Sequence, residues 1–119
     1  MWRAAPPRVE APLHGIGVGE RPAVGLARVV RDADDLLRLV EGDVLVAVAT
    51  TTAFNAIFPL LAAVVTEQGS LFSPAAILAR ELGLPAVLGV PDLFAGVHDG
   101  DLIEVDPQAG AVRIIAAAG

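Results

Sequence analysis

The stretch Thr66–Val90, TEQGSLFSPAAILARELGLPAVLGV, decides the fold class of this chain. It contains a typical helix start at Ser73–Pro74, because serine is a favoured N-cap and proline at the first helical position loses no hydrogen bond. Ala75–Leu82 are strong helix formers, and Gly83 is the kind of residue that ends a helix. The apolar run Ala86–Val90 then predicts a buried strand. A helix followed directly by a buried strand is typical of an α/β domain.

The segments on either side continue this alternation. Asp32 is a good N-cap for a short helix ending near Gly42, and Pro59 is expected to shorten a second helix at Thr52–Leu61. Strands are expected at Ala23–Val30, Val44–Val48 and Ala62–Val65, and a hairpin at Leu102–Val105 and Val112–Ile115. The pattern predicts an α/β layered domain with a mixed sheet.

The composition fits one globular domain with a short extension. The chain has 119 residues, and 55% of them are hydrophobic, which is enough to bury a core. Met1–Pro12 holds three of the nine prolines and no hydrophobic periodicity, which indicates a linker or N-terminal arm. The domain is therefore expected to span residues 13–119.

The charge and cysteine content exclude several classes of function. Eight arginines and no lysine stand against fourteen acidic residues, for a net charge of -6, so a nucleic-acid partner is not expected. The absence of cysteine excludes disulfides and thiolate chemistry. Val44–Thr66 is uncharged, but three consecutive threonines and Pro59 interrupt it, so a membrane span is not expected. The N-terminus lacks the apolar run of a signal peptide, and we expect a cytoplasmic protein.

Few side chains form a recognisable catalytic or metal-binding pattern. The glycines of His14–Glu20 match neither dinucleotide nor Walker spacing, which favours a structural loop or a bulged strand. His14 and His98 lie beside glycines at no ligand spacing, so no metal site is expected. Ser70 and Ser73 lack a nucleophile motif.

The helix Ser73–Leu82 offers two weaker candidates. Arg80 and Glu81 point apart on the helix, which favours a structural ion pair with another segment over acid and base catalysis. The free N–H groups and the dipole at the helix start could hold a phosphoryl group. The candidate anion-binding residues there are Gly69, Ser73, Ala75 and Ala76.

Residues 66–90 closely resemble the signature of the phosphohistidine swivelling domain of phosphoenolpyruvate (PEP)-utilising enzymes, such as PEP synthase and pyruvate phosphate dikinase. The resemblance extends to Gly25–Val30, Gly42–Val46 with Thr50, Asp99–Asp101 and Val105–Asp106, and Thr50, Arg80 and Glu81 are its motif residues. It implies a three-layer β/β/α unit on flexible tethers. In that family the domain carries a phosphoryl group between a nucleotide site and a separate PEP or pyruvate site.

The chain departs from the family pattern at the residue that carries the chemistry. The resemblance places the phosphorylated histidine at Pro74, and proline has no nucleophile. Ser70 replaces a second glycine that is common before the signature, and Thr52 replaces a proline after the threonine cluster. No catalytic residue and no cofactor are therefore expected.

Two functions follow from this departure. The first is a degenerate mobile domain that is a non-catalytic binding or regulatory module, or one part of a larger phosphotransferase assembly. The alternative is an active phosphoryl carrier of a PEP synthase-like or dikinase-like phosphotransferase with an unexpected acceptor. The resemblance implies an ATP-grasp-like nucleotide-binding, or a PEP- or pyruvate-binding, protein or domain as partner, and the chain alone is not expected to be an enzyme.

Overall fold

The computed structural model describes residues 11–118. Within them the strands are β1 (Leu13–His14), β2 (Ile16–Val18), β3 (Ala23–Val30), β4 (Val44–Ala47), β5 (Ala63–Thr66), β6 (Ala86–Leu88), β7 (Leu102–Asp106) and β8 (Ala111–Ala116). The α-helices are α1 (Pro74–Leu82) and α2 (Leu93–Gly96), and the 3-10 helices are η2 (Ala33–Arg38), η3 (Thr52–Phe54) and η4 (Phe58–Leu60). The predicted linker Met1–Pro12 falls almost wholly outside the described residues, so it stays a prediction.

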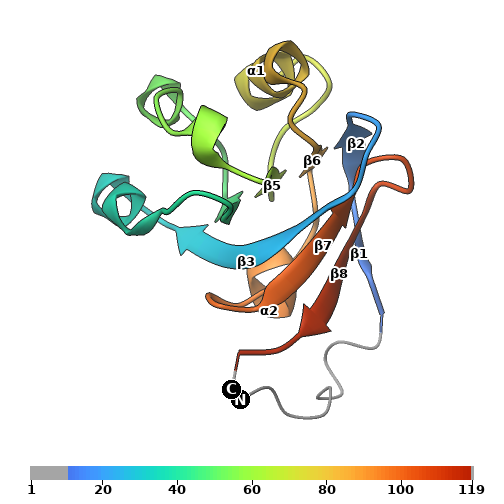
Figure 1. The fold of residues 1–119 in the computed structure, drawn as a ribbon. Helices are drawn as coiled ribbons and strands as arrows, with labels where there is room; N and C mark the ends of the chain where they lie inside the picture. The colour runs from blue at the N-terminus through green and yellow to red at the C-terminus, as the bar shows by residue number, and fades with distance from the viewer. Residues whose placement is uncertain (1–10, 119) are drawn as a thin grey trace.

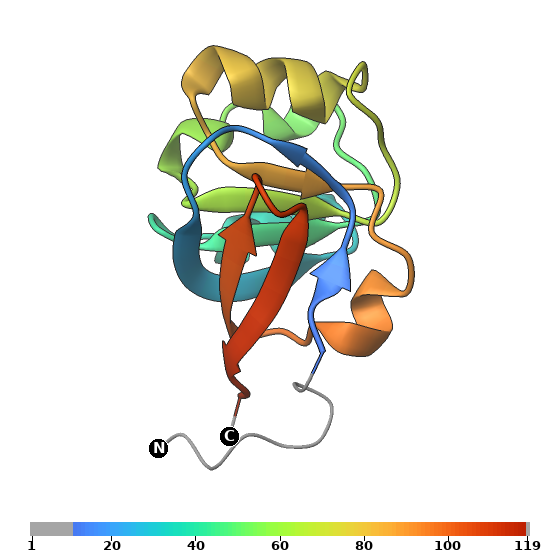
Figure 2. The ribbon, with the colours of Figure 1, turned by 90° about the vertical axis from the view of Figure 1, so that its right-hand side faces the viewer.

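The strands form one continuous mixed sheet in the order β1-β8-β7-β3-β4-β5-β6-β2. β3, β4, β5 and β6 pair in parallel, and the other pairings are antiparallel. β3 belongs to both halves of the sheet, since Ala23–Leu26 pair with β7 and Ala27–Val30 pair with β4. β1 and β2 are consecutive in the chain but lie at opposite ends of this order. The sheet therefore curls into a nearly closed barrel (Figure 1, Figure 2).

The parallel strands separate two apolar cores. On one face α1 and the 3-10 helices cover the sheet (Figure 1), and the core there includes Leu45 and Ala76. On the opposite face the β7–β8 hairpin and α2 pack against the sheet, around Val46 and Ile103. Alternate residues of one strand thus enter different cores, as the period-2 geometry of a strand requires. The expected α/β fold with β/β/α layers is confirmed.

The predicted strands and α1 are found within two residues of their expected bounds, but the helices before α1 differ. The helix expected to run to Gly42 ends at Arg38 as a 3-10 helix, η2. The single helix expected at Thr52–Leu61 is wrong, because η3 and η4 are two separate 3-10 helices. Pro59 lies inside η4 and has no N–H to donate to an α-helical ladder through this segment.

An ion-pair network ties η2 to β3 and to the loop before β7. Arg38 Nη1 lies 3.0 Å from Asp99 Oδ2, and Asp99 Oδ1 accepts a hydrogen bond from the backbone N–H of Val29 at 2.7 Å. A backbone hydrogen bond from Arg31, and then the charge of Arg38, lower the pKa of the Asp35 carboxyl below its ordinary value. The carboxylates of Asp35 and Asp99 therefore connect η2, β3 and the loop before β7.

The glycine-containing segment His14–Glu20 contains the end of β1 and all of β2, and it joins the two ends of the sheet. Gly15 N donates to Gly110 O at 2.9 Å, and Gly17 lies against the β7–β8 turn. A Cβ at Gly17 would overlap the carbonyl oxygen of Pro107. These glycines thus allow close approach of two backbones, which agrees with the structural role predicted for them.

We expect Gly17→Ala to destabilise the domain by about 2 kcal/mol or more, because the new methyl group meets backbone, which cannot move aside as a side chain can. Urea unfolding followed by circular dichroism measures the change. Gln108→Ala, at an exposed position next to Pro107, is the control and should leave the midpoint nearly unchanged. Equal stability of both variants would contradict the close approach.

Candidate functional site

The loop of residues 67–73, which we call the pre-α1 loop, leads from β5 to the start of α1. Its first part continues the sheet, because Glu67 N donates to Ala47 O at 3.0 Å. The hydroxyl of Thr66, a residue only 1% exposed, donates to the carbonyl oxygen of Gln68 at 2.6 Å. The sheet and one buried hydroxyl therefore fix where the loop begins.

The second part of the loop is a hydrogen-bonded turn before the helix. Ser73 N and Ser73 Oγ both donate to the carbonyl oxygen of Ser70, at 3.1 and 2.8 Å. The backbone N–H of Phe72 donates to Ser70 Oγ at 3.3 Å. Ser73 occupies the predicted N-cap position of α1, but its side chain makes no capping hydrogen bond. Its hydroxyl instead holds the turn.

Two cavities adjoin the start of α1, and Pro74 lines both. The smaller, of about 210 Å³, is lined by Ala49, Thr50, Gln68, Gly69, Ser73, Pro74 and Ala75. The larger, of about 610 Å³, is lined by Thr51, Thr52, Asn55, Pro74, Ile77, Leu78 and Glu81. The structure thus brings Gly69, Ser73 and Ala75 together with Thr50, whereas Ala76 is fully buried in the core.

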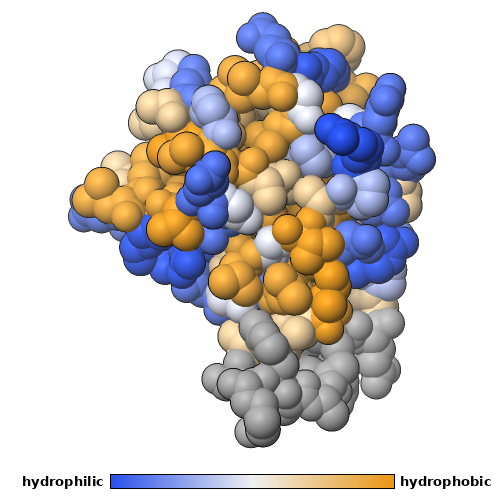
Figure 3. Space-filling view, in the orientation of Figure 1, coloured by the Kyte–Doolittle hydropathy of each residue, from blue (hydrophilic) through white to orange (hydrophobic). Residues whose placement is uncertain are grey.

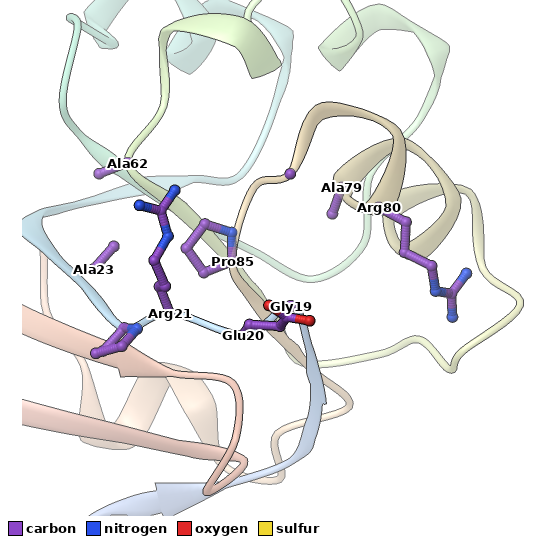
Figure 4. Close-up of a pocket in the computed structure, with 10 residues that line it drawn as sticks. Gly19, Glu20, Arg21, Ala23, Ala62, Ala79, Arg80 and Pro85 are labelled. Carbon is purple, nitrogen blue, oxygen red and sulfur yellow. The ribbon is translucent and has the colours of Figure 1, made fainter.

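Arg80 and Glu81 have separate surroundings. Arg80 Nη2 donates to the carbonyl oxygen of Leu71 at 2.6 Å, which links the second turn of α1 to the pre-α1 loop. Figure 4 shows a further cavity, of about 560 Å³, at the C-terminal end of α1; the guanidinium of Arg21 lies beside Pro85 there, while that of Arg80 points away from Arg21. The predicted ion pair is not found within residues 11–118, and a backbone carbonyl takes its place.

The described residues offer little for covalent chemistry at the start of α1. Pro74 has no nucleophilic atom, and the Ser73 hydroxyl is already engaged with Ser70. His14 lies in β1, paired with β8, and His98 follows α2, on the side of the sheet opposite α1 (Figure 1). Neither imidazole is among the hydrogen-bond partners of Ser73 within the described residues.

Residues 39–110 match the family described as the mobile domain of PEP-utilising enzymes. The chain belongs to that family. The uncharacterized phosphotransferase YvkC of Bacillus subtilis is 37% identical over 103 residues, which cover 87% of this chain and 12% of YvkC. The PEP synthase of Deinococcus radiodurans is 37% identical over 98 residues, covering 82% of this chain and 13% of that enzyme.

Solved structures contain the same fold. The solution structure of Enzyme I (nEIt) has a TM-score of 0.57 and 30% identity, and the match covers 69% of this chain and 37% of that one. This mobile domain spans only 12% and 13% of the two curated relatives, each of which is a much longer protein.

The part of the chain that the structure describes contains neither a cluster of metal-ligating side chains nor a helix that could span a membrane. No three histidine or acidic side chains there lie close enough to hold a metal ion. No described helix has the length and apolar character needed to cross a bilayer.

Sequence reasoning missed the most exposed aromatic side chain near the mobile domain's helix start. Phe72, two residues before Pro74, is 86% exposed. Leu71 and Ile77 beside it are 42% and 49% exposed. The sequence signal was the apolar pair Leu71–Phe72 within a loop of small and polar residues. Because the same pattern occurs in loops whose apolar side chains are buried, it did not predict exposure.

We expect Thr66→Val to destabilise the mobile domain by about 1–2 kcal/mol, because the Gln68 carbonyl would lose a buried donor. Urea unfolding gives the free energy of unfolding. The substitution should also accelerate amide hydrogen exchange more in the pre-α1 loop than in β7 and β8. Thr52→Val, at an exposed position, is the control. Unchanged exchange at residues 67–70 would show that this hydroxyl does not hold the loop.

Proposed function

We propose that this chain is a degenerate mobile domain, a non-catalytic binding module of a larger phosphotransferase assembly. Pro74 at the first position of α1 carries the proposal, because this is where the family resemblance implies a phospho-accepting histidine. A phosphoryl carrier needs a nucleophile that attacks phosphorus and later releases it. The proline ring provides none.

The relatives support a larger protein as the context of this domain. The matched segment covers 13% of the Deinococcus radiodurans PEP synthase, which supports a role as one part of a larger assembly. The partner that we propose is an ATP-grasp-like nucleotide-binding domain, or a PEP- or pyruvate-binding one, in the same chain or a separate one.

The alternative is an active carrier that uses another acceptor. Ser73 is the nearest hydroxyl to the start of α1, but it donates to Ser70, and no carboxylate or imidazole hydrogen-bonds to it among the described residues. A serine phosphate ester also has a lower transfer potential than the phosphoramidate of phosphohistidine. The geometry therefore supports binding better than phosphoryl carriage.

We expect the unsubstituted chain to stay unmodified when it is incubated with ATP and the Deinococcus radiodurans PEP synthase, because residue 74 cannot form a bond to phosphorus. Pro74→His should gain one phosphoryl group that is stable in alkali and lost in acid. Mass spectrometry under alkaline conditions, with peptide mapping, measures both.

Pro74→Ala, which also lacks a nucleophile, is the matched control and should stay unmodified. Any phosphoryl group on the unsubstituted chain, whether acid-labile or acid-stable as it would be on serine, would contradict the proposal and support the alternative. Peptide mapping would then identify the acceptor.

A second candidate function is non-covalent binding of an anion. The cavity of about 210 Å³ favours it, since Gly69, Ser73 and Ala75 line this cavity at the positive end of the α1 dipole. Pro74 removes one of the N–H groups that would contact the anion, so only weak binding is expected.

Titration with inorganic phosphate, followed through backbone amide chemical shifts, tests this second function. We expect saturable shifts confined to residues 69–76, with a dissociation constant on the order of 1 mM or weaker. Sodium chloride at matched ionic strength is the control, because a general salt effect would move amides over the whole surface. No movement at residues 69–76 would dismiss the anion site.

A further inference from the structure

A cavity of about 330 Å³ lies where β3 ends, between η2, α2 and the loop that follows α2. It shares no lining residue with the two cavities beside Pro74. In Figure 1, η2 and α2 lie on either side of the end of β3, and Figure 3 shows hydrophilic and apolar side chains next to one another over the η2 side of the molecule. Small-molecule sites typically have this size and combine apolar walls with a few polar groups.

Most charged groups in the lining of this cavity already have partners within the protein. Asp99 accepts hydrogen bonds from the backbone N–H of Val29 at 2.7 Å and from Arg38 Nη1 at 3.0 Å. Asp35 Oδ2 accepts a hydrogen bond from the backbone N–H of Arg31 at 2.8 Å, and Asp35 Oδ1 lies 3.4 Å from Arg38 Nε. Arg38 Nη2 donates to the carbonyl oxygen of Val29 at 2.6 Å. Both carboxylates and one of the two guanidinium groups are therefore engaged before any ligand binds.

Two side-chain donors of the lining remain available to a ligand. The guanidinium of Arg31 makes no ion pair or hydrogen bond within residues 11–118, and it lies over the Phe94 ring, 5.0 Å from the ring centre. The imidazole of His98 also has no hydrogen-bond partner there, since only the backbone N–H of this residue is bonded, to Asp101 at 2.9 Å. A guanidinium offers only N–H donors, and an imidazole can donate through a ring nitrogen. The ligand group that complements both side chains is therefore an oxyanion.

The surroundings of Arg31 favour a carboxylate that carries an apolar body. The hydrogen bond to Asp35 fixes the backbone of Arg31, and the cation–π contact with Phe94 restrains its guanidinium, so little conformational entropy is lost on binding. The planar fork of a guanidinium matches the two oxygens of a carboxylate. Phe94 and Val97 belong to the apolar core beneath this cavity and line it, which gives an apolar body surface to pack against.

We propose that this cavity binds a small carboxylate with an apolar body, that Arg31 holds the carboxylate, and that His98 is a second donor to it. The apolar body packs against Phe94 and Val97. This site goes beyond the proposed function and does not depend on it, because neither Pro74 nor any residue of the pre-α1 loop lines the cavity.

Titration of this chain with benzoate at constant ionic strength, followed through backbone amide chemical shifts, tests the site. We expect saturable shifts at residues 29–38 and 94–99, with a dissociation constant on the order of 1 mM. Arg31→Gln should weaken binding about tenfold or more, because the carboxylate loses its charged partner. His98→Phe, which keeps a ring but has no ring N–H, should weaken binding about threefold.

Arg21→Gln is the matched control and should leave the affinity for benzoate unchanged. Arg21 is likewise an exposed arginine without an ion pair within residues 11–118, but it lines a different cavity, at the C-terminal end of α1 (Figure 4). Unchanged amide signals of β4 and β5 show that each variant is folded. Benzyl alcohol has the ring without the charge, and inorganic phosphate has the charge without the ring, so each should bind this cavity about tenfold more weakly than benzoate.

Several results would overturn the carboxylate site. One is an affinity for benzoate that Arg31→Gln leaves unchanged, or that Arg21→Gln lowers equally. Equal binding of benzyl alcohol would show that the carboxylate is not recognised, and equal binding of phosphate would show that the apolar body is not. Benzoate shifts confined to residues 69–76 would place the ligand at the start of α1 instead of here. An unchanged affinity in His98→Phe would overturn the assignment of His98 as the second donor.

Discussion

Burial of the parallel strands on both faces is the constraint on which the rest of this domain depends. Every residue of β4 and β5 is buried, and alternate side chains point into different cores. A sheet of this kind needs cover on each side, which α1 with the 3-10 helices supplies on one face and the β7–β8 hairpin on the other. Because both faces of these strands are covered, the loops at their ends are where side chains remain accessible to a ligand or partner. The pre-α1 loop begins where β5 ends, so the strand pairing fixes the position of the site.

The sequence allowed the elements with local signals to be predicted, and α1 shows why. Proline at its first position and Gly83 after its last act on the backbone directly, and Gly83 adopts the left-handed conformation that ends the helix (φ 66°). The segment Thr52–Leu61 has no such pair of signals. Phe58, 1% exposed, is inserted into the core there, and tertiary packing rather than propensity sets the short 3-10 turns. The bounds of such a segment depend on contacts far away in the chain.

The site was also predictable only in part, because some of its features have local sequence signals and others depend on the path of the loop. The helix start directed attention to Gly69 and Ser73, and the family resemblance to Pro74, and these residues do lie together at one cavity. The role of Arg80 could not be deduced, because its partner is a backbone carbonyl, and every residue has one. The exposure of Phe72 was equally hidden, since a hydrophobic side chain in a loop is as compatible with the core as with the surface. Partners and exposure come from the path of the loop, which sequence periodicity does not describe.

The hydrogen bonds of the pre-α1 loop separate recognition from chemistry. They connect Thr66 to Gln68, Ser70 to Phe72 and Ser73, and Arg80 to Leu71, and none of them uses the side chain of residue 74. The side chain at position 74 can therefore vary without removing a support of the loop. Proline is moreover well suited to the first turn of a helix, so α1 begins normally with Pro74 at its first position. The scaffold thus has a physical basis that does not depend on phosphoryl transfer, and this is compatible with the binding function proposed for the domain.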